Sequence, residues 1–276
     1  MSAFDVELVG KIGSMALIRK EDNDIDYNIF SRLGAQLRPG IIWISSGATE
    51  IGRLDYMKRN NGLELSGAID DIKTDYAAQG QSILMENYRR FINPKYSIRQ
   101  VLVEHYHFND EEKRKNIRNL LLRAVKQGAI PIINYNDPVS VAEIRKMELR
   151  DLKSQRERVV ECVDNDETAA VVAELVKAKL LVILTSVDGI YKDPANKDTL
   201  IKEITGSTID ELIENVNQAQ KGCCGASRAW SNGAWAKLEY IKTPLRNGTK
   251  VIIGNAAYKL SELIEGTVNR TVIGIR

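Results

Sequence analysis

The chain has 276 residues, of which 43% are hydrophobic and 28% charged, and its formal net charge is +2. This composition is that of an ordinary globular protein, and the small charge gives no global field for nucleic acid or an anionic membrane. No apolar run approaches the length needed to cross a bilayer, and the first residues lack the pattern of a signal peptide. We therefore expect a cytoplasmic protein with no nucleic-acid or membrane partner.

Short apolar runs alternate with longer helical patterns along the chain. Most of the runs are rich in Val, Ile and Leu, which is typical of strands buried on both faces of a parallel sheet. The expected strands are 6–9, 41–45, 100–104, 130–134, 180–185, 251–253 and 271–275. The expected helices are about 25–35, 68–92, 110–127, 166–177 and 208–219. This alternation predicts a three-layer αβα sandwich around a mainly parallel sheet.

Small and polar residues follow the first two strands, at the edge of the sheet where α/β proteins bind ligands. Lys11 lies between Gly10 and Gly13, so the backbone can come close to a ligand while the ammonium points at it. Ser46 and Gly47 offer backbone N–H groups to a phosphate or carboxylate. A surface lysine and a turn with a helix N-cap would explain the same residues.

Amides and acids follow the later strands. Asn134 ends the strand at 130–134 and Asp137 follows in the next turn. Both suit a zwitterion, with Asp137 on the ammonium, although an ordinary Asn-Asp-Pro turn explains them equally well. The acids and amide of 164–166 open the helix expected at 166–177. The strand at 180–185 ends in the polar turn 185–189.

These segments, taken together and in this order, resemble the amino acid kinase family, and within it the glutamate 5-kinases. The resemblance covers nearly the whole chain and keeps most of the family's spacing. The matching segments are 10–14, 45–48, 77–81, 100–102, 117–119, 131–137, 164–166, 184–191 and 237–238.

The resemblance implies the amino acid kinase fold as a single domain over 1–276, with an acceptor-binding lobe at 1–170 and a nucleotide-binding lobe at 171–276. It implies phosphorylation of the side-chain carboxylate of L-glutamate by ATP, which gives an acyl phosphate at the start of proline synthesis. Mg²⁺ would be held by the ATP phosphates, with no metal ligand from the protein. A homo-oligomer is expected by the same resemblance.

The resemblance also assigns roles to residues. Lys11 and Lys237 would neutralise the transferring phosphoryl group, and Asp166 would orient both lysines. The implied acceptor-binding residues are Ser46, Gly47, Asn134, Asp137 and Asn165. The implied nucleotide-binding residues are Lys11, Gly13, Ser14, Thr185, Ser186, Asp188, Tyr191, Ser231, Asn232, Gly233 and Lys237, with 231–233 in a loop. A carboxylate is already ionised at neutral pH, so this chemistry needs positioning and charge neutralisation more than a general base.

The chain departs from the family pattern near both expected sites. Residues 231–233 keep one glycine of a glycine-rich loop, Ser186 stands where an Asp is usual, and Tyr135 where a Glu is usual. The charged segment 142–160 lengthens a loop near the acceptor. It predicts either a solvated helix or a lid or subunit contact that brings positive charge over an anionic ligand. A kinase for another small acid (a phosphonate, phosphate or carbamate) and a non-catalytic nucleotide-binding regulator are the alternative functions.

The histidines and cysteines give no strong signal of their own. His105 and His107 are two apart at an expected strand end, and without further ligands a structural role is favoured over a metal site. Cys162, Cys223 and Cys224 form no CxxC pattern and are expected to be reduced thiols.

Overall fold

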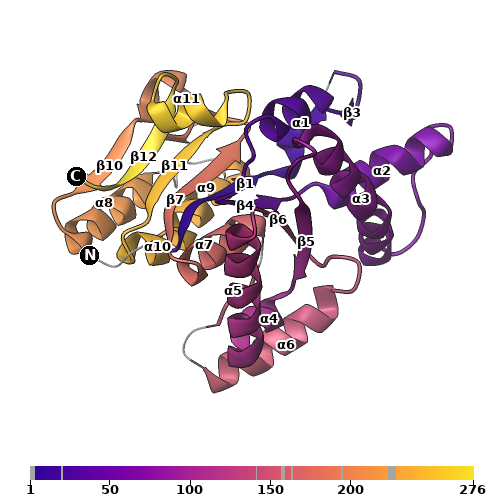
Figure 1. Cartoon of the computed structure of the whole chain (residues 1–276), viewed down its shortest axis with the longest axis horizontal. Coiled ribbons are helices and arrows are strands. Elements are labelled where there is room, and N and C mark those ends of the chain that lie inside the picture. Colours follow the sequence, from indigo (N-terminus) through magenta and orange to yellow (C-terminus); the bar gives the residue numbers. More distant parts are fainter. Residues whose placement is uncertain are drawn as a thin grey trace.

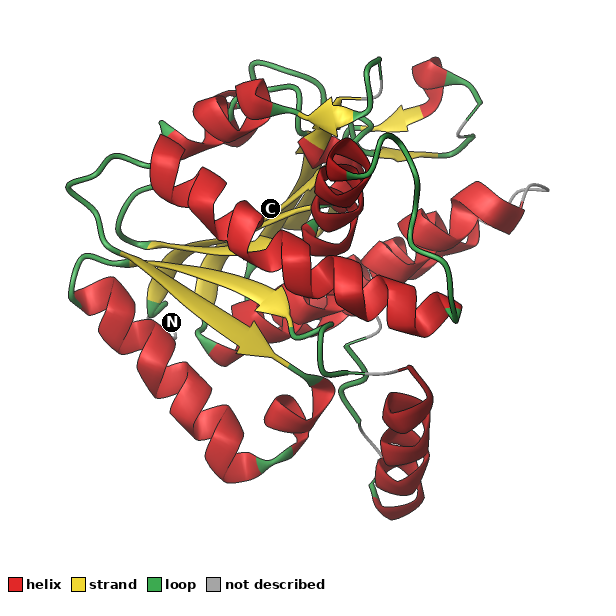
Figure 2. Cartoon of the chain, turned by 90° about the vertical axis from the view of Figure 1, so that its right-hand side faces the viewer, coloured by secondary structure: helices red, strands yellow, loops and turns green. Residues whose placement is uncertain are grey.

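The computed structural model describes residues 4–19, 21–140, 142–156, 159–162, 164–193, 195–222 and 228–276, without the side chains of 142–144 and 228–232. In these residues one central sheet lies between two layers of helices (Figure 1). Figure 2, turned by 90°, shows helices on both faces of the sheet. The three-layer αβα sandwich expected from the sequence is confirmed.

The described residues form a central sheet of eight strands in the order β10-β12-β11-β7-β1-β4-β6-β5. In chain order these strands are β1 (Val6–Ile12), β4 (Ile41–Ser45), β5 (Ile98–Val103), β6 (Ile130–Tyr135), β7 (Ala178–Thr185), β10 (Glu203–Gly206), β11 (Lys250–Asn255) and β12 (Arg270–Ile275). Neighbouring strands are parallel except β11 and β12, so β12 and β10 run against the other six. The seven expected strands are present, and β10 is additional because its four residues contain a single large apolar side chain.

Two short antiparallel ribbons lie outside the central sheet. One pairs β2 (Ile18–Arg19) with β3 (Asp24–Ile25), and the other pairs β8 (Ile190–Tyr191) with β9 (Leu200–Ile201). Two 3₁₀ turns, η1 (Ser14–Leu17) and η2 (Lys197–Thr199), precede β2 and β9. These short elements were not expected, because two-residue strands leave no periodic pattern in a sequence.

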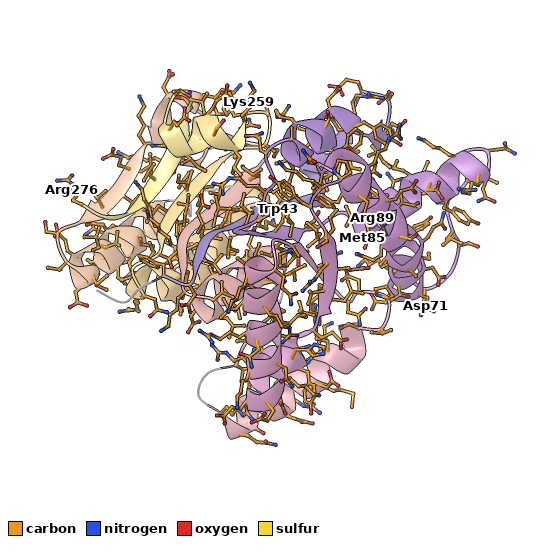
Figure 3. All side chains as sticks on the ribbon, in the orientation of Figure 1. Trp43, Asp71, Met85, Arg89, Lys259 and Arg276 are labelled. Carbon is orange, nitrogen blue, oxygen red and sulfur yellow. The ribbon has the colours of Figure 1, made fainter. Side chains whose placement is uncertain are left out.

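The helices divide between the two faces of the sheet. One face carries α1 (Tyr27–Gly34), α2 (Ala48–Arg59), α3 (Ile69–Phe91) and α11 (Leu260–Glu265). The other carries α5 (Glu111–Lys126), α7 (Asn165–Leu175), α8 (Ile209–Gly222), α9 (Arg228–Tyr240) and α10 (Lys242–Arg246). Successive strand residues alternate between the two cores, as Trp43 (labelled in Figure 3) and Ile44 of β4 do. Helices α4 (His105–Asn109) and α6 (Ala142–Gln155) lie near the lower end of α5 (Figure 1).

Helix α2 was not among the expected helices, although the alternative explanation of Ser46 as an N-cap placed a helix start here. It begins after Gly47, whose φ of 112° is a left-handed conformation that favours glycine. Ser46 is therefore not the N-cap of this helix. Helix α2 packs closely on α3, because Gly52 and Gly80 leave room for the facing backbone. A Cβ atom at Gly52 would lie 1.8 Å from the carbonyl oxygen of Tyr76.

Gly52→Ala should therefore destabilise the protein by about 1–3 kcal/mol, the usual cost of overpacking a tight contact. Alanine favours a helix by about 1 kcal/mol over glycine, but this gain is smaller than the clash with the α3 backbone. Gly222→Ala is the matched control, because a Cβ there meets no atom of the described residues within 4 Å. Denaturant unfolding of both variants measures the difference, and equal stability would contradict the close helix contact.

The strand register brings the carboxyl ends of the parallel strands to one edge of the sheet. Ile12 of β1 pairs with Ser45 of β4 and with Leu184 of β7. Asn255 at the end of β11 pairs with Thr185 at the end of β7. Polar residues that are far apart in sequence therefore meet at this edge, as expected for a ligand site in a parallel sheet.

The structure corrects the expected placement of the histidines. His105 and His107 lie in helix α4, not on a strand end, and the His107 Nδ1 atom accepts a hydrogen bond from the Glu104 N–H (2.9 Å). Cys162 is buried with a free thiol, and Cys223 and Cys224 lie outside the described residues. Across the described ranges, no helix is both long enough and apolar enough to span a membrane.

Candidate active site

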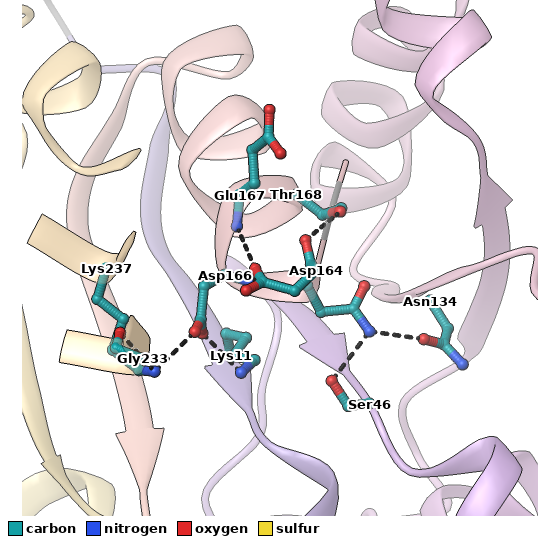
Figure 4. A network of polar contacts seen from close by, with 10 residues as sticks. Lys11, Ser46, Asn134, Asp164, Asp166, Glu167, Thr168, Gly233 and Lys237 are labelled. Carbon is teal, nitrogen blue, oxygen red and sulfur yellow. Dashed lines mark hydrogen bonds and ion pairs between the residues drawn. The ribbon is translucent and has the colours of Figure 1, made fainter. Parts of the chain in front are cut away.

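Two lysines and one aspartate form a charge cluster at the carboxyl edge of the sheet, with Lys11 and Asp166 buried and Lys237 half-buried (Figure 4). Lys11 of β1 places its Nζ 2.6 Å from Asp166 Oδ1, and Lys237 of α9 places its Nζ 2.9 Å from Asp166 Oδ2. Lys237 also donates to the carbonyl oxygen of Gly233 (3.3 Å). The structure thus brings together the three residues expected to be catalytic, which come from three elements far apart in sequence.

Helix α7 fixes the position of Asp166. Asp164 is the N-cap of this helix, and its side chain accepts hydrogen bonds from the N–H groups of Asp166 (2.8 Å) and Glu167 (3.0 Å). Burial acts to raise the pKa of Asp166, but the charges and hydrogen bonds of Lys11 and Lys237 outweigh it, so the pKa lies below its ordinary value. The aspartate is ionised at neutral pH, and the three side chains carry a net charge of +1.

A glycine lies beside each of the two ammonium groups. A Cβ atom on Gly13 would lie 3.6 Å from Lys11 Nζ, and one on Gly233 would lie 3.7 Å from Lys237 Nζ. Both lysines are thus approached by backbone without a side chain, which leaves room for an anion. Gly13 directly precedes the turn η1, which begins at Ser14.

Three amides and one hydroxyl form a second cluster, whose Asn165 lies next to Asp166 in sequence. Asn165 Nδ2 donates to Ser46 Oγ and to Asn134 Oδ1, both at 2.9 Å (Figure 4). Asn134 Nδ2 donates in turn to Gln81 Oε1 (2.8 Å), and the Tyr135 N–H donates to Asn134 Oδ1 (2.9 Å). The buried Asn165 Oδ1 has no hydrogen-bond partner among the described residues. This oxygen is available to a ligand that carries a donor.

Gln81 was missed as a site residue, although it lies in the segment 77–81 that carries part of the family resemblance. Its role becomes visible only when α3 and β6 are packed together. Gly47 lies beside this cluster in sequence, after Ser46.

Asp137 follows β6 and is half-buried, and its side chain makes no hydrogen bond to the amides. Burial raises the pKa of Asp137 to about 6, against the opposing charge of Arg145.

A pocket of about 630 Å³ opens at the ends of β7 and β11 and reaches the first cluster at Lys237. Six residues expected at the nucleotide line it: Thr185, Ser186, Asp188, Tyr191, Gly233 and Lys237. The residues that were not expected there are Val187, Gly189, Ile190, Ala195, Lys197, Ala234, Ile253 and Asn255. Lys11, Gly13 and Ser14 are not part of this lining.

The polar turn after β7 is held by its own hydrogen bonds. Thr185 Oγ1 donates to the carbonyl oxygen of Val187 (2.7 Å) and accepts from its N–H (3.0 Å). Asn255 Nδ2 donates to Asp188 Oδ1 (3.0 Å), which ties the turn to the end of β11. Asn255 could have been found from its place after the strand expected at 251–253.

The expected loop at 231–233 is wrong, because these residues lie within helix α9. The side chains of Ser231 and Asn232 lie outside the described residues, so their expected nucleotide contacts stay predictions. Among the described side chains, no group of three or more His, Cys, Asp and Glu residues could hold a metal ion.

The sequence profile of the amino acid kinase family matches residues 8–255, and the chain belongs to this family. It is an ATP-dependent kinase of this family. It is 31% identical to the glutamate 5-kinase of Alkaliphilus metalliredigens, over 96% of this chain and 94% of the relative. It is also 31% identical to that of Thermoanaerobacter sp. (strain X514), over 98% of this chain and 67% of the relative.

Solved structures agree on the fold. Carbamate kinase from Giardia lamblia bound to AMP-PNP has a TM-score of 0.60 and 12% identity, over the full length of both chains. UMP kinase from Ureaplasma parvum has a TM-score of 0.55 and 13% identity, over 98% of each chain. At these identities the likeness concerns the fold alone.

Proposed function

We propose that this kinase transfers the γ-phosphoryl group of ATP to the side-chain carboxylate of L-glutamate. The observation that carries the proposal is the position of the Lys11–Asp166–Lys237 cluster. It adjoins the amide cluster through the neighbouring residues Asn165 and Asp166, and it reaches the 630 Å³ pocket through Lys237. Relatives named glutamate 5-kinase, at about 31% identity, support glutamate as the acceptor.

The proposed reaction needs no general base. A carboxylate oxygen of glutamate attacks the γ-phosphorus, the bond from that phosphorus to the bridging oxygen breaks, and ADP leaves with its electron pair. Lys11 and Lys237 neutralise charge on the transferring group, and Asp166 holds both ammonium groups in place. Mg²⁺ bound to the ATP phosphates would neutralise further charge. Both oxygens of Asp166 are engaged by lysines, which suits a metal held by phosphates rather than by this carboxylate.

In this proposal residues 1–170 bind the acceptor and residues 171–276 bind the nucleotide, except that Lys11, Gly13 and Ser14 reach its phosphates. Asp137 and the free Asn165 Oδ1 accept hydrogen bonds from the ammonium of glutamate. Ser46, Gly47 and Asn134 complete the acceptor site. The nucleotide site uses Thr185, Ser186, Asp188, Tyr191, Ser231, Asn232 and Gly233.

The direct test is coupled ADP release with MgATP and a panel of small acids, with hydroxylamine present to trap an acyl phosphate. Hydroxamate formed with L-glutamate and not with the other acids is the expected result. ADP release with another acid, without glutamate hydroxamate, would reject glutamate and keep the kinase.

This second candidate, a kinase for another small acid, is favoured by one observation. Tyr135, which stands where a Glu is usual, contacts Ser140 (2.9 Å) and His105 (3.2 Å).

The role of Asp137 predicts a pH dependence. Its pKa is raised to about 6, so its charge is present above pH 6 and is lost as the pH falls through 6. We expect kcat/KM for glutamate to fall about tenfold per pH unit below that point, because an uncharged Asp137 no longer attracts the ammonium. Asp137→Asn should lower kcat/KM about 10- to 100-fold at pH 7.5 and flatten the profile. If the same fall persists in Asp137→Asn, another group such as His105 sets it.

A further inference from the structure

Helix α6 places an arginine beside the proposed acceptor site. The guanidinium carbon of Arg145 lies 5.5 Å from the centre of the Tyr135 ring, and Tyr135 is the last residue of β6. The charge of Arg145 also opposes the rise that burial causes in the pKa of Asp137, two residues further along. The guanidinium is thus close enough to act on both Tyr135 and Asp137, which follow Asn134 in the acceptor segment.

Contacts on both sides of Arg145 hold α6 in this position. Glu148, one turn along the helix, places its Oε2 3.1 Å from Nε2 of His105, a side chain that is only 1% exposed. The other ring nitrogen of His105 lies 3.2 Å from the Tyr135 hydroxyl, which also contacts Ser140 Oγ (2.9 Å). The same aromatic ring therefore carries the guanidinium on its face, while its hydroxyl contacts His105, the residue that Glu148 of α6 faces.

Arg145 has no carboxylate partner in the described part of the chain. The carboxylates of Glu148 and Glu161 lie against other groups there, Glu148 against His105 and Glu161 against Lys153 of α6 (2.7 Å). The cations of the catalytic cluster, Lys11 and Lys237, are engaged by Asp166. Arg145 is thus a cation near Asp137 that makes no ion pair with any acid of the described residues.

We propose that Arg145 binds the α-carboxylate of the acceptor and makes the enzyme select acids with a second carboxylate beside the ammonium. The inference rests on the proposed function and names the group that recognises its substrate. In L-glutamate the γ-carboxylate reacts and the ammonium pairs with Asp137, so the α-carboxylate still needs a cation. The planar fork of a guanidinium matches a carboxylate with two parallel hydrogen bonds.

The test compares L-glutamate with 4-aminobutyrate, which keeps the ammonium and the reacting carboxylate and lacks the α-carboxylate. Arg145→Gln should raise KM for glutamate about 10- to 100-fold, the usual effect of losing a charged hydrogen-bond partner, and leave kcat and the KM for ATP within about twofold. Turnover of 4-aminobutyrate should stay at its wild-type level. Arg145→Lys should recover part of the glutamate affinity, since it restores the charge without the fork.

Arg150→Gln is the matched control, because Arg150 is an exposed arginine of the same helix. It should leave both acceptors unchanged, and thermal unfolding should show all variants folded. An unchanged KM for glutamate in Arg145→Gln would reject the role of Arg145 and leave the proposed function standing. An equal loss for both acceptors, or a loss in kcat alone, would also reject it. A wild-type protein that forms no glutamate hydroxamate would reject the proposed function itself.

Discussion

Lys11→Ala and Lys237→Ala should each lower kcat at least about 100- to 1000-fold, the range seen when one preorganised group that stabilises transition-state charge is removed. Each variant removes one of the two ammonium groups that Asp166 holds at the edge of the sheet. Steady-state ADP release with saturating glutamate and ATP measures the effect. Most of the loss should appear in kcat rather than in KM, because the charge on the phosphoryl group is stabilised most strongly in the transition state.

The control for this pair is Lys179→Ala, an exposed lysine near the start of β7. It should leave kcat unchanged. The double variant Lys11→Ala/Lys237→Ala should lose less than the product of the two single losses, since both lysines act on one group through one carboxylate. A single lysine variant with near wild-type kcat would remove that lysine from the catalytic cluster.

Asp166→Asn should lower the free energy of unfolding by about 3–5 kcal/mol, because removing one partner of a buried ion pair leaves charge without compensation. Here two ammonium groups are left, and their side chains are 8% and 18% exposed. Activity should fall as well, since the lysines repel each other once the carboxylate is gone. Denaturant unfolding at pH 7 measures the stability, with Asp75→Asn, an exposed aspartate of α3, as control.

The pH dependence of this difference tests its electrostatic origin. The pKa of Asp166 is lowered in the folded protein, so its stabilising contribution is present above the ordinary pKa of about 4 and is lost as the pH falls through the folded value. The gap between the wild type and Asp166→Asn should therefore be full at pH 7 and shrink below about pH 4. A gap that is independent of pH would indicate a packing defect instead.

Much of the fold could be predicted from the sequence, and the reason lies in the strands. Strands such as β1, β4 and β7 are buried on both faces, so their runs of Val, Ile and Leu stand out. Strand β10 was not recognised in the sequence, because an edge strand of four residues carries too little apolar surface. Helix α2 was missed because Gly52, which its contact with α3 requires, weakens a helical pattern.

The candidate site could be predicted only in part. Physical reasoning found polar residues after the strands, but the pairing of Lys11, Asp166 and Lys237 came from the family resemblance, because no local pattern joins such distant residues. The same resemblance misplaced 231–233 in a loop. The contacts of Gln81 and Arg145 depend on how α3 and α6 pack beside β6, and sequence spacing does not contain that information.

The side-chain amides of the second cluster have a fixed orientation of oxygen and nitrogen, and the backbone of β6 determines it. The Tyr135 N–H can only donate, so the side-chain oxygen of Asn134 must face it. Asn165 must then offer its nitrogen to that oxygen and keep its own oxygen free. A single peptide group thus decides which end of an amide the ligand meets. An amino acid presents a donor to that oxygen, whereas the corresponding 2-oxo acid presents a second acceptor and is repelled.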